Sequence, residues 1–428
     1  MSGHIGIFGN EDINVAPLLH WSLYALQHRG EVGSGLVVVD DDKINELRGP
    51  GLVSDIYKEE EINSIKGNKG AAHVRYAFED DDKNATFLPE VFPCEKTQAL
   101  LSIDGNFLEK ALSRKHIADF LCNEEDLPEK IKNLKGAYSI IHINKDRMIA
   151  IRDPWGIKNL VLGKYDNSYV VASETAAIDS IGAEFLRDIL PGEIVTIDKD
   201  GLKSQFTGER QEKNCIFEYV YIARQDSYIG GKSVYEARYN MGRRLAEEEP
   251  VNGDLVIGAP DSGTIAALGY SHESRIPYKE GILKNRYVGR SFILPDQRMR
   301  EKAVKIKMNP LKKNLDGKRV ILVDDSIVRG TTIKSTVKML RDAGAIEVHV
   351  RIACPPVKHS CDLCVDTPDE KYLIGANLSV EDTCKEIGAD SLAYLSLDSL
   401  VSVCGGNRFC KHCFDGNYPI EVENGNNL

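Results

Sequence analysis

The sequence predicts two domains of different architecture: an α+β sandwich-like domain over residues 1–210, then an α/β domain with a parallel sheet over residues 211–428. The first half holds many short β-branched runs separated by turn residues, which is typical of sheet-rich structure. The second half alternates longer helical patterns with single buried strands, as parallel sheets covered by helices on both faces do. A length of 428 residues also suits two domains.

In the first half, strands are expected at residues 4–10, 33–42, 137–146, 147–156, 169–174 and 193–201, each bounded by Gly, Asp or Asn. Helical patterns lie between some of them, at residues 17–28 and 116–121. In the second half, a helix is expected at 234–248 and strands at 254–260, 319–326 and 346–354. A helix closed by Gly344 joins the last two strands.

Composition excludes several classes of protein. Apolar residues make up 42% and charged residues 28% of the chain, as in ordinary globular proteins. The net charge of −11 argues against a general nucleic-acid role, since phosphate backbones favour basic surfaces. No apolar run reaches the roughly 18 residues of a membrane helix. The first residues lack the basic and apolar regions of a signal peptide, so a cytoplasmic protein is expected.

The most specific motif covers residues 320–332, VILVDDSIVRGTT. An apolar strand delivers Asp324 and Asp325 to the edge where open α/β sheets bind ligands. A short loop then opens a helix, whose N-terminal amides and hydroxyls suit a 5′-phosphate. Carboxylates suit ribose hydroxyls and Mg²⁺. The string therefore predicts a site for phosphoribosyl pyrophosphate (PRPP), formed by Asp324, Asp325, Ser326, Val328, Arg329, Gly330, Thr331 and Thr332, with both aspartates also near Mg²⁺.

A second strand-to-helix turn supports the same ligand. Residues 258–263, GAPDSG, follow the strand expected at 254–257 and precede an apolar helix. Free backbone amides in such a turn can take a pyrophosphate group. The residues expected to contact it are Pro260, Asp261, Ser262 and Gly263.

Residues 215–420 resemble the transferase half of the glutamine phosphoribosylpyrophosphate amidotransferase family of purine synthesis. Besides the two loops, the matching strings are CIFEYVYIARQDS (215–227), KNRYVGRSFILP (284–295), KMNPLKKNLDGKRV (307–320) and RIACPPVKH (351–359). The resemblance implies a loop that closes over PRPP, with Lys284, Arg286 and Arg290 neutralising the departing pyrophosphate. It also implies a homo-oligomer, purine-nucleotide binding, and an N-terminal domain built like the N-terminal-nucleophile hydrolases.

Seven of the ten cysteines lie between Cys354 and Cys413, and disulfides are not expected in a cytoplasmic protein. The resemblance implies a 4Fe–4S cluster on Cys215, Cys361, Cys410 and Cys413. Spacing alone leaves zinc open as the less favoured metal. A rearranged set also stays open, because Cys354, Cys364 and Cys404 lie nearby in sequence. Cys384 is expected as a small core residue on a helix.

The glutaminase half departs from the family pattern at its catalytic positions. The family's nucleophilic N-terminal cysteine is replaced by Ile5, which has no lone pair to attack with. The Asn-Gly pair that stabilises the oxyanion reads Asp104-Gly105, and a carboxylate there repels an oxyanion. The scaffold strings survive, among them ALQHRG (25–30) and RDPWG (152–156). Arg75, the expected clamp for the glutamine carboxylate, then has a folding role. The domain is predicted to fold without hydrolysing glutamine.

Three functions remain open on the sequence. The first is formation of phosphoribosylamine and pyrophosphate from PRPP with ammonia, either free or from a separate glutaminase. The second is a silent regulatory protein that senses PRPP or purine nucleotides beside a complete paralogue. The third is a PRPP transferase that uses another amine.

Overall fold

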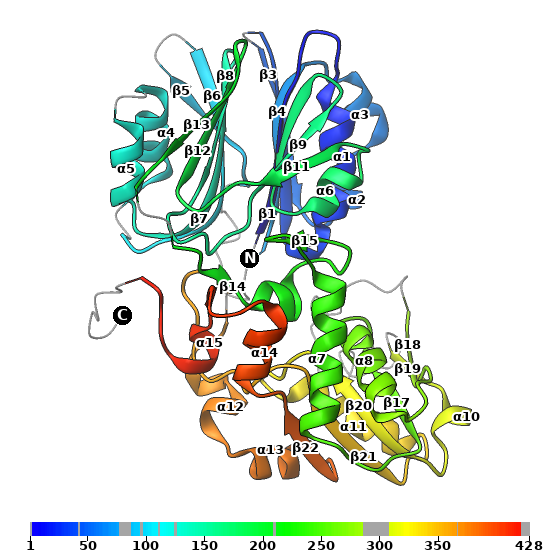
Figure 1. The fold of residues 1–428 in the computed structure, drawn as a ribbon. Helices are drawn as coiled ribbons and strands as arrows, with labels where there is room; N and C mark the ends of the chain where they lie inside the picture. The colour runs from blue at the N-terminus through cyan, green and yellow to red at the C-terminus, as the bar shows by residue number, and fades with distance from the viewer. Residues whose placement is uncertain are drawn as a thin grey trace.

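The computed structural model describes residues 2–41, 43–76, 87–94, 97–109, 112–123, 126–208, 211–285, 308–365 and 367–420. Figure 1 shows two bodies joined end to end, with the two facing sheets of the first above the helix-covered sheet of the second. Within the described residues, no helix is long and apolar enough to cross a bilayer.

The N-terminal body is a four-layer sandwich of helices, two antiparallel sheets and helices (Figure 1). One sheet has the order β11-β9-β10-β1-β4-β2-β3 and the other β13-β12-β8-β7-β6-β5. The strands are β1 (Ser2–Phe8), β2 (Gly33–Asp40), β3 (Lys43–Pro50), β4 (Lys69–Arg75), β5 (Glu90–Cys94), β6 (Thr97–Phe107), β7 (Gly136–Ile143), β8 (Arg147–Arg152), β9 (Val161–Tyr165), β10 (Ser168–Ala172), β11 (Glu184–Asp188), β12 (Glu193–Asp198) and β13 (Gly201–Phe206). The helices are α1 (Val15–Leu26), η1 (Gln27–Arg29), α2 (Val53–Ile56), α3 (Glu59–Ser64), α4 (Arg114–Asn123), α5 (Leu127–Asn133) and α6 (Thr175–Asp179).

Three apolar layers hold this sandwich together. Ile5 and Ile7 of β1 pack with α1 on the outer face of the first sheet. Val37, Ile141 and neighbouring residues fill the space between the two sheets. A third cluster joins the second sheet to α4 and α5. Alternate residues of each strand point into different layers, which explains the periodicity of the sequence.

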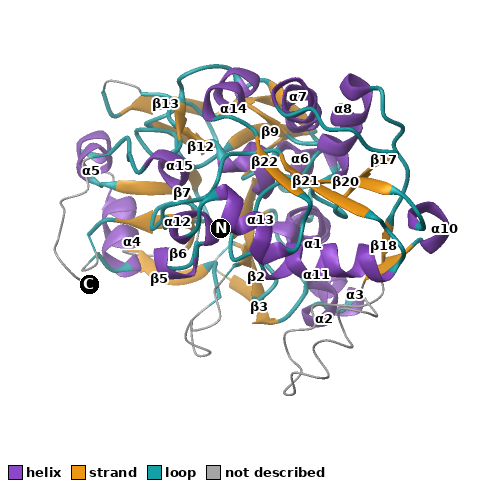
Figure 2. Cartoon of the chain, turned by 90° about the horizontal axis from the view of Figure 1, so that it is seen from below, coloured by secondary structure: helices purple, strands orange, loops and turns teal. Residues whose placement is uncertain are grey.

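The C-terminal body is built on a four-stranded parallel sheet of order β17-β20-β21-β22. Figure 2 shows α7 and α8 on one face of this sheet and α11 and α13 on the other. Its strands are β17 (Leu255–Gly258), β20 (Arg319–Asp324), β21 (Glu347–Ile352) and β22 (Ser391–Tyr394). The smaller pairs are β14 (Asn214–Cys215) with β23 (Phe409–Cys410), β15 (Tyr228–Ile229) with β16 (Lys232–Ser233), and β18 (Ile282–Lys284) with β19 (Met308–Pro310).

The helices of this body are η2 (Glu218–Ile222), α7 (Val234–Glu248), α8 (Thr264–Ser274), α10 (Lys312–Leu315), α11 (Thr331–Asp342), η4 (Glu370–Tyr372), α12 (Ile374–Asn377), α13 (Val380–Ile387), α14 (Leu397–Cys404) and α15 (His412–Asp415). The expected helix at 234–248 and the three expected strands are confirmed. Ser233 caps α7 by accepting a hydrogen bond from the Glu236 amide, as an N-cap serine does.

One expectation about cysteines is wrong. Cys94 and Cys122 form a disulfide. The end of β5 and the last turn of α4 bring their Cα atoms to 5.5 Å, within the range that a disulfide spans. The expectation rested on a cytoplasmic location alone. The sequence around Cys94 and Cys122 does not indicate that the two elements meet.

Candidate functional site

The two ligand loops predicted from sequence lie side by side. They follow adjacent parallel strands, since Gly258 of β17 pairs with Val323 of β20. The Ala259 amide donates to the Val323 carbonyl at 2.9 Å. A Cβ on Gly263 would lie 2.4 Å from that carbonyl oxygen, so only glycine permits this approach. Both loops therefore open at one edge of the sheet, where open α/β sheets bind ligands.

The acidic pair lies at the end of β20. The Asp325 amide donates to Asp324 Oδ1 at 2.9 Å, and the Ser326 hydroxyl donates to Asp325 Oδ2 at 2.6 Å. Burial and the neighbouring charge of Asp325 raise the pKa of Asp324 well above its usual value. Neither carboxylate has an ion-pair partner among the described residues. Two adjacent carboxylates suit a hard divalent ion such as Mg²⁺.

The residues expected to bind the 5′-phosphate lie at the start of α11. Gly330 precedes this helix with a φ of 79°, a left-handed conformation that favours glycine. Thr331 and Thr332 are exposed, so their hydroxyls and amides are accessible at a helix N-terminus. The loop is held from behind, because the Ile374 amide donates to the Val328 carbonyl at 2.9 Å. Arg329 lies over the ring of Tyr372, 5.7 Å from its centroid.

The second loop carries the positions expected to meet pyrophosphate. Pro260 and Ser262 are half-buried and Asp261 is exposed. Lys284, at the end of β18, reaches Asp261 with Nζ 2.6 Å from Oδ2. The structure thus brings one predicted cation to the loop. Arg286 and Arg290 lie outside the described residues.

The cysteines implied as metal ligands come together from three segments. Cys215 and Cys410 are partners in the β14–β23 pair. Cys361 Sγ accepts hydrogen bonds from the amides of Cys364 and Val365, each at 3.4 Å. The Cys413 carbonyl accepts from the amides of residues 358 and 359, just before Cys361. All four thiols are buried.

Burial and neighbouring thiols make these cysteines harder to ionise. Burial, with further contributions from Cys361 and Cys364, raises the pKa of Cys410 to about 12. Burial, Cys361 and Cys410 likewise raise the pKa of Cys413. Buried thiols of this kind lose their protons readily only when they bind a metal cation. The four cysteines therefore fit a metal ion or cluster. Cys364 is also buried there, and a hydrogen bond with Cys215 lowers its pKa. Cys384 is only half-buried on α13.

Ile5, the residue expected at the position of the glutaminase nucleophile, is part of the core. Ile5 lies inside β1, paired with Ala72 on one side and Ala172 on the other. Its side chain is fully buried and packs with the α1 layer. Residues 2–4 continue the same strand, and the Ser2 carbonyl accepts a hydrogen bond from Arg29 at 2.8 Å.

At the position expected to stabilise the oxyanion, Asp104 forms a buried ion pair with Lys158. Lys158 Nζ lies 2.9 Å from Asp104 Oδ1, and both side chains are at most 2% exposed. Burial alone would raise the pKa of Asp104, but the charges of Lys158 and Arg29 hold it below its usual value. Asp104 is therefore a charged acceptor that has no proton to donate to an oxyanion. Asn106, two residues on, donates to the Asp362 carbonyl at 2.8 Å, which joins this strand to the cysteine-bearing loop.

Sequence reasoning missed a buried charge group between the two bodies. Arg29 pairs with Glu174 of the sandwich and with Glu218, which follows Cys215. Glu174 also accepts from the Ser227 hydroxyl at 2.7 Å. These residues lie in the segments 25–30, 169–174 and 215–227, but no local pattern indicates that the segments meet. The sequence offers one indication of this group, which is the presence of charged residues inside otherwise apolar runs.

The fold and site define a glutamine-amidotransferase-type sandwich followed by a phosphoribosyltransferase-type α/β domain. Comparison with known families agrees: a glutamine amidotransferase domain matches residues 103–180, and a phosphoribosyl transferase domain matches residues 252–381.

Known relatives cover almost the whole chain. It is 42% identical to the amidophosphoribosyltransferase of Mycobacterium tuberculosis over 97% of this chain and 86% of the relative. It is 40% identical to that of Methanocaldococcus jannaschii over 99% and 98%. A solved structure of glutamine PRPP amidotransferase from B. subtilis, complexed with ADP and GMP, superimposes with a TM-score of 0.89, at 37% identity and covering 99% of this chain and 98% of the other.

The chain belongs to the amidophosphoribosyltransferase family of PRPP-dependent glycosyltransferases. The family and fold-class predictions are confirmed.

Proposed function

We propose that this chain forms 5-phosphoribosylamine and pyrophosphate from PRPP with ammonia, and that its glutaminase half is silent. The observation that carries the proposal is a contrast within one chain. The PRPP loops keep their glycines, carboxylates and helix N-terminus. The nucleophile position is a core isoleucine, and the oxyanion position is a buried carboxylate–ammonium pair.

In this mechanism the loop before α11 binds the 5′-phosphate, and Asp324 and Asp325 orient the ribose through its hydroxyls. The turn at 260–263 holds the pyrophosphate, where Lys284 moves from Asp261 to the developing negative charge. Bound Mg²⁺ would supply further positive charge to the leaving group. Arg286 and Arg290 are proposed to join Lys284 when the segment at 284–295 closes and excludes water.

Pyrophosphate release from PRPP, measured with ammonium present, tests the transferase. The Asp324→Asn/Asp325→Asn double variant should lower this rate at least about 100-fold, as loss of charge stabilisation does. Lys338→Ala on the exposed face of α11 is the matched control and should keep the full rate. Equal rates in all three proteins would overturn the proposal.

We propose that Cys215, Cys361, Cys410 and Cys413 hold a 4Fe–4S cluster that fastens residues 361–413 to the transferase domain. One zinc ion needs sulfurs about 3.8 Å apart. Among the described residues, no three of these cysteines lie within 4.8 Å of one another, which suits a wider cluster. Cys361→Ser should lose iron and acid-labile sulfide, and Cys384→Ser should keep both. Equal contents would remove Cys361 from the ligand set.

Feedback by purine nucleotides belongs to the same proposal, because the B. subtilis structure is a complex with ADP and GMP. A regulatory protein without turnover is the competing function, and it predicts PRPP binding with no pyrophosphate release. A homo-oligomer, a separate glutaminase and a complete paralogue remain proposed partners. Product identity distinguishes ammonia from another amine.

A further inference from the structure

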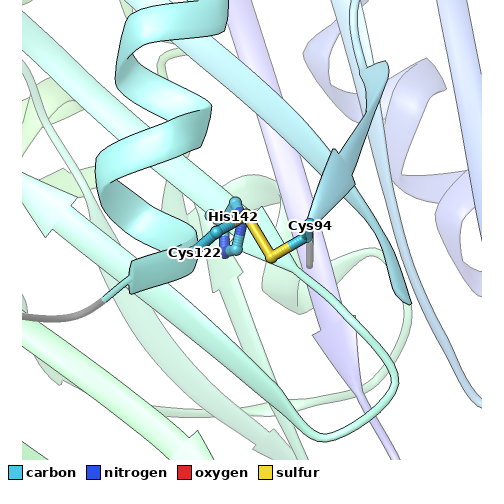
Figure 3. Close-up of side chains that lie close together, drawn as sticks. All are labelled: Cys94, Cys122 and His142. Atoms are coloured by element: carbon cyan, nitrogen blue, oxygen red, sulfur yellow. A yellow bond between two sulfur atoms is a disulfide. The ribbon is translucent and has the colours of Figure 1, made fainter. Parts of the chain in front are cut away.

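Three side chains outside both sites converge at one end of the second sheet. Cys94 ends β5, Cys122 lies in the last turn of α4, and His142 comes from β7. Their two sulfurs and one ring nitrogen all lie within 4.8 Å of one another. Figure 3 shows the imidazole directed at the sulfur pair. His142 is fully buried, and Cys94 is 6% exposed.

The geometry is close to that of a tetrahedral metal site. His142 Nε2 lies 3.8 Å from Cys122 Sγ. With zinc–sulfur bonds of about 2.3 Å and zinc–nitrogen bonds of about 2.0 Å, tetrahedral ligands are about 3.5 Å apart for N and S and about 3.8 Å for two S. The distance between the nitrogen and the Cys122 sulfur is within about 0.3 Å of this spacing. Only the second sulfur has to move, by rotation about its own side-chain bonds once the disulfide is reduced.

The chemistry of His142 favours a ligand role. His142 is buried, and the lone pair of Nε2, the ring nitrogen 3.8 Å from Cys122 Sγ, is available to a metal. Its Nδ1 is buried without a hydrogen-bond partner among the described residues. Leaving a buried polar atom unpaired costs about 1–3 kcal/mol, a cost that an apolar side chain at this position would avoid.

We propose that Cys94, Cys122 and His142 form a second metal site, which binds a zinc-class cation when the disulfide is reduced. A small dithiol supplies two electrons and two protons, is itself oxidised to its disulfide, and leaves two protein thiols. Binding the cation then releases both thiol protons, and water takes the fourth position. In either state β5 stays tied to α4, by a covalent bond when oxidised and by the metal when reduced.

The test is a zinc count on the full chain. Oxygen-free protein is treated with a phosphine reductant or left oxidised, loaded with zinc, freed of excess and measured by mass spectrometry. Reduced protein should retain about one more zinc ion per chain than oxidised protein. Cys94→Ser, Cys122→Ser and His142→Gln should each lose this extra zinc. Cys384→Ser, with a half-buried cysteine elsewhere, should keep it.

The cysteines near Cys215 are the same in all these proteins. If the proposed iron–sulfur cluster is absent, the zinc content of every protein therefore changes by the same amount. An unchanged count on reduction, or an extra zinc that survives in His142→Gln, would overturn the second site. Thermal unfolding of each variant shows whether it is folded, and Cys122→Ser provides a second reading if His142→Gln is not.

Discussion

Arg29 Nη2 lies 2.6 Å from Glu218 Oε1, although the two residues are 189 positions apart and each is only 1% exposed. Arg29 belongs to the sandwich, and Glu218 lies in the segment between Cys215 and α7. Arg29 also donates to Glu174 and to the Ser2 carbonyl. One guanidinium thus joins the first strand of the sandwich to the transferase body.

Arg29→Ala should destabilise the whole chain. It leaves Glu218 buried without its cation and Glu174 with His28 as its remaining ion-pair partner among the described residues, which costs about 3–5 kcal/mol. Denaturant unfolding measures this loss. Lys385→Ala breaks an exposed helical pair with Glu381 and should cost less than about 1 kcal/mol. Equal midpoints for both variants would show that the buried group does not hold the bodies together.

Acid should destabilise the sandwich through its buried histidines. Burial lowers the pKa of His4 to about 4 and of His73 to about 3, and both rings bond to Ser102. The unfolded chain binds these protons near pH 6.5, so the stabilising contribution is complete above that pH. It is lost as the pH falls from 6.5 towards 4, by roughly 3 kcal/mol for His4.

The free energy of unfolding measured from pH 7 to 4.5 checks this prediction. His4→Gln should reduce the dependence of the unfolding free energy on pH. Replacement of the exposed His116 is the matched control, because it also removes one imidazole. A slope that is identical with and without His4 would contradict the account.

Gly330→Ala should damage the phosphate loop. Its φ of 79° is unfavourable for alanine, and a Cβ would lie 2.6 Å from Ile374 Cδ1. Displacement of the loop should lower PRPP turnover about 100-fold. Gly388 has a similar φ of 75° with nothing within 4 Å of its Cβ position, so Gly388→Ala tests the same strain without the contact. Similar losses of PRPP turnover in both variants would mean that backbone strain alone, and not displacement of this loop, lowers the turnover.

Ile5→Cys should not restore a glutaminase. The residue lies within a strand that is hydrogen-bonded on both sides, so its thiol would be a buried hydrophobe without a neighbouring free amine. Glutamate formation from glutamine is the measurement, and the unchanged chain is the control. Glutamate above the level of that control would show that only the nucleophile has been lost.

Local patterns predicted the elements that are local. The strand before Asp324, the glycine turn before α11 and the helix at 234–248 all follow from periodicity and capping. The Arg29–Glu218 pair, the Cys94–Cys122 disulfide and the Asp104–Lys158 pair join residues 189, 28 and 54 positions apart. Such contacts depend on how the folded sheets and helices pack against one another. A short stretch of sequence carries no information on this packing.

The most direct test follows nitrogen into the product. PRPP and Mg²⁺ are incubated with either nitrogen-15-labelled ammonium or amide-labelled glutamine, and labelled phosphoribosylamine is measured with pyrophosphate. We expect labelled product and pyrophosphate from ammonium, and neither above background from glutamine. Label transferred from glutamine would contradict the silent glutaminase, and its absence from both sources would contradict the transferase.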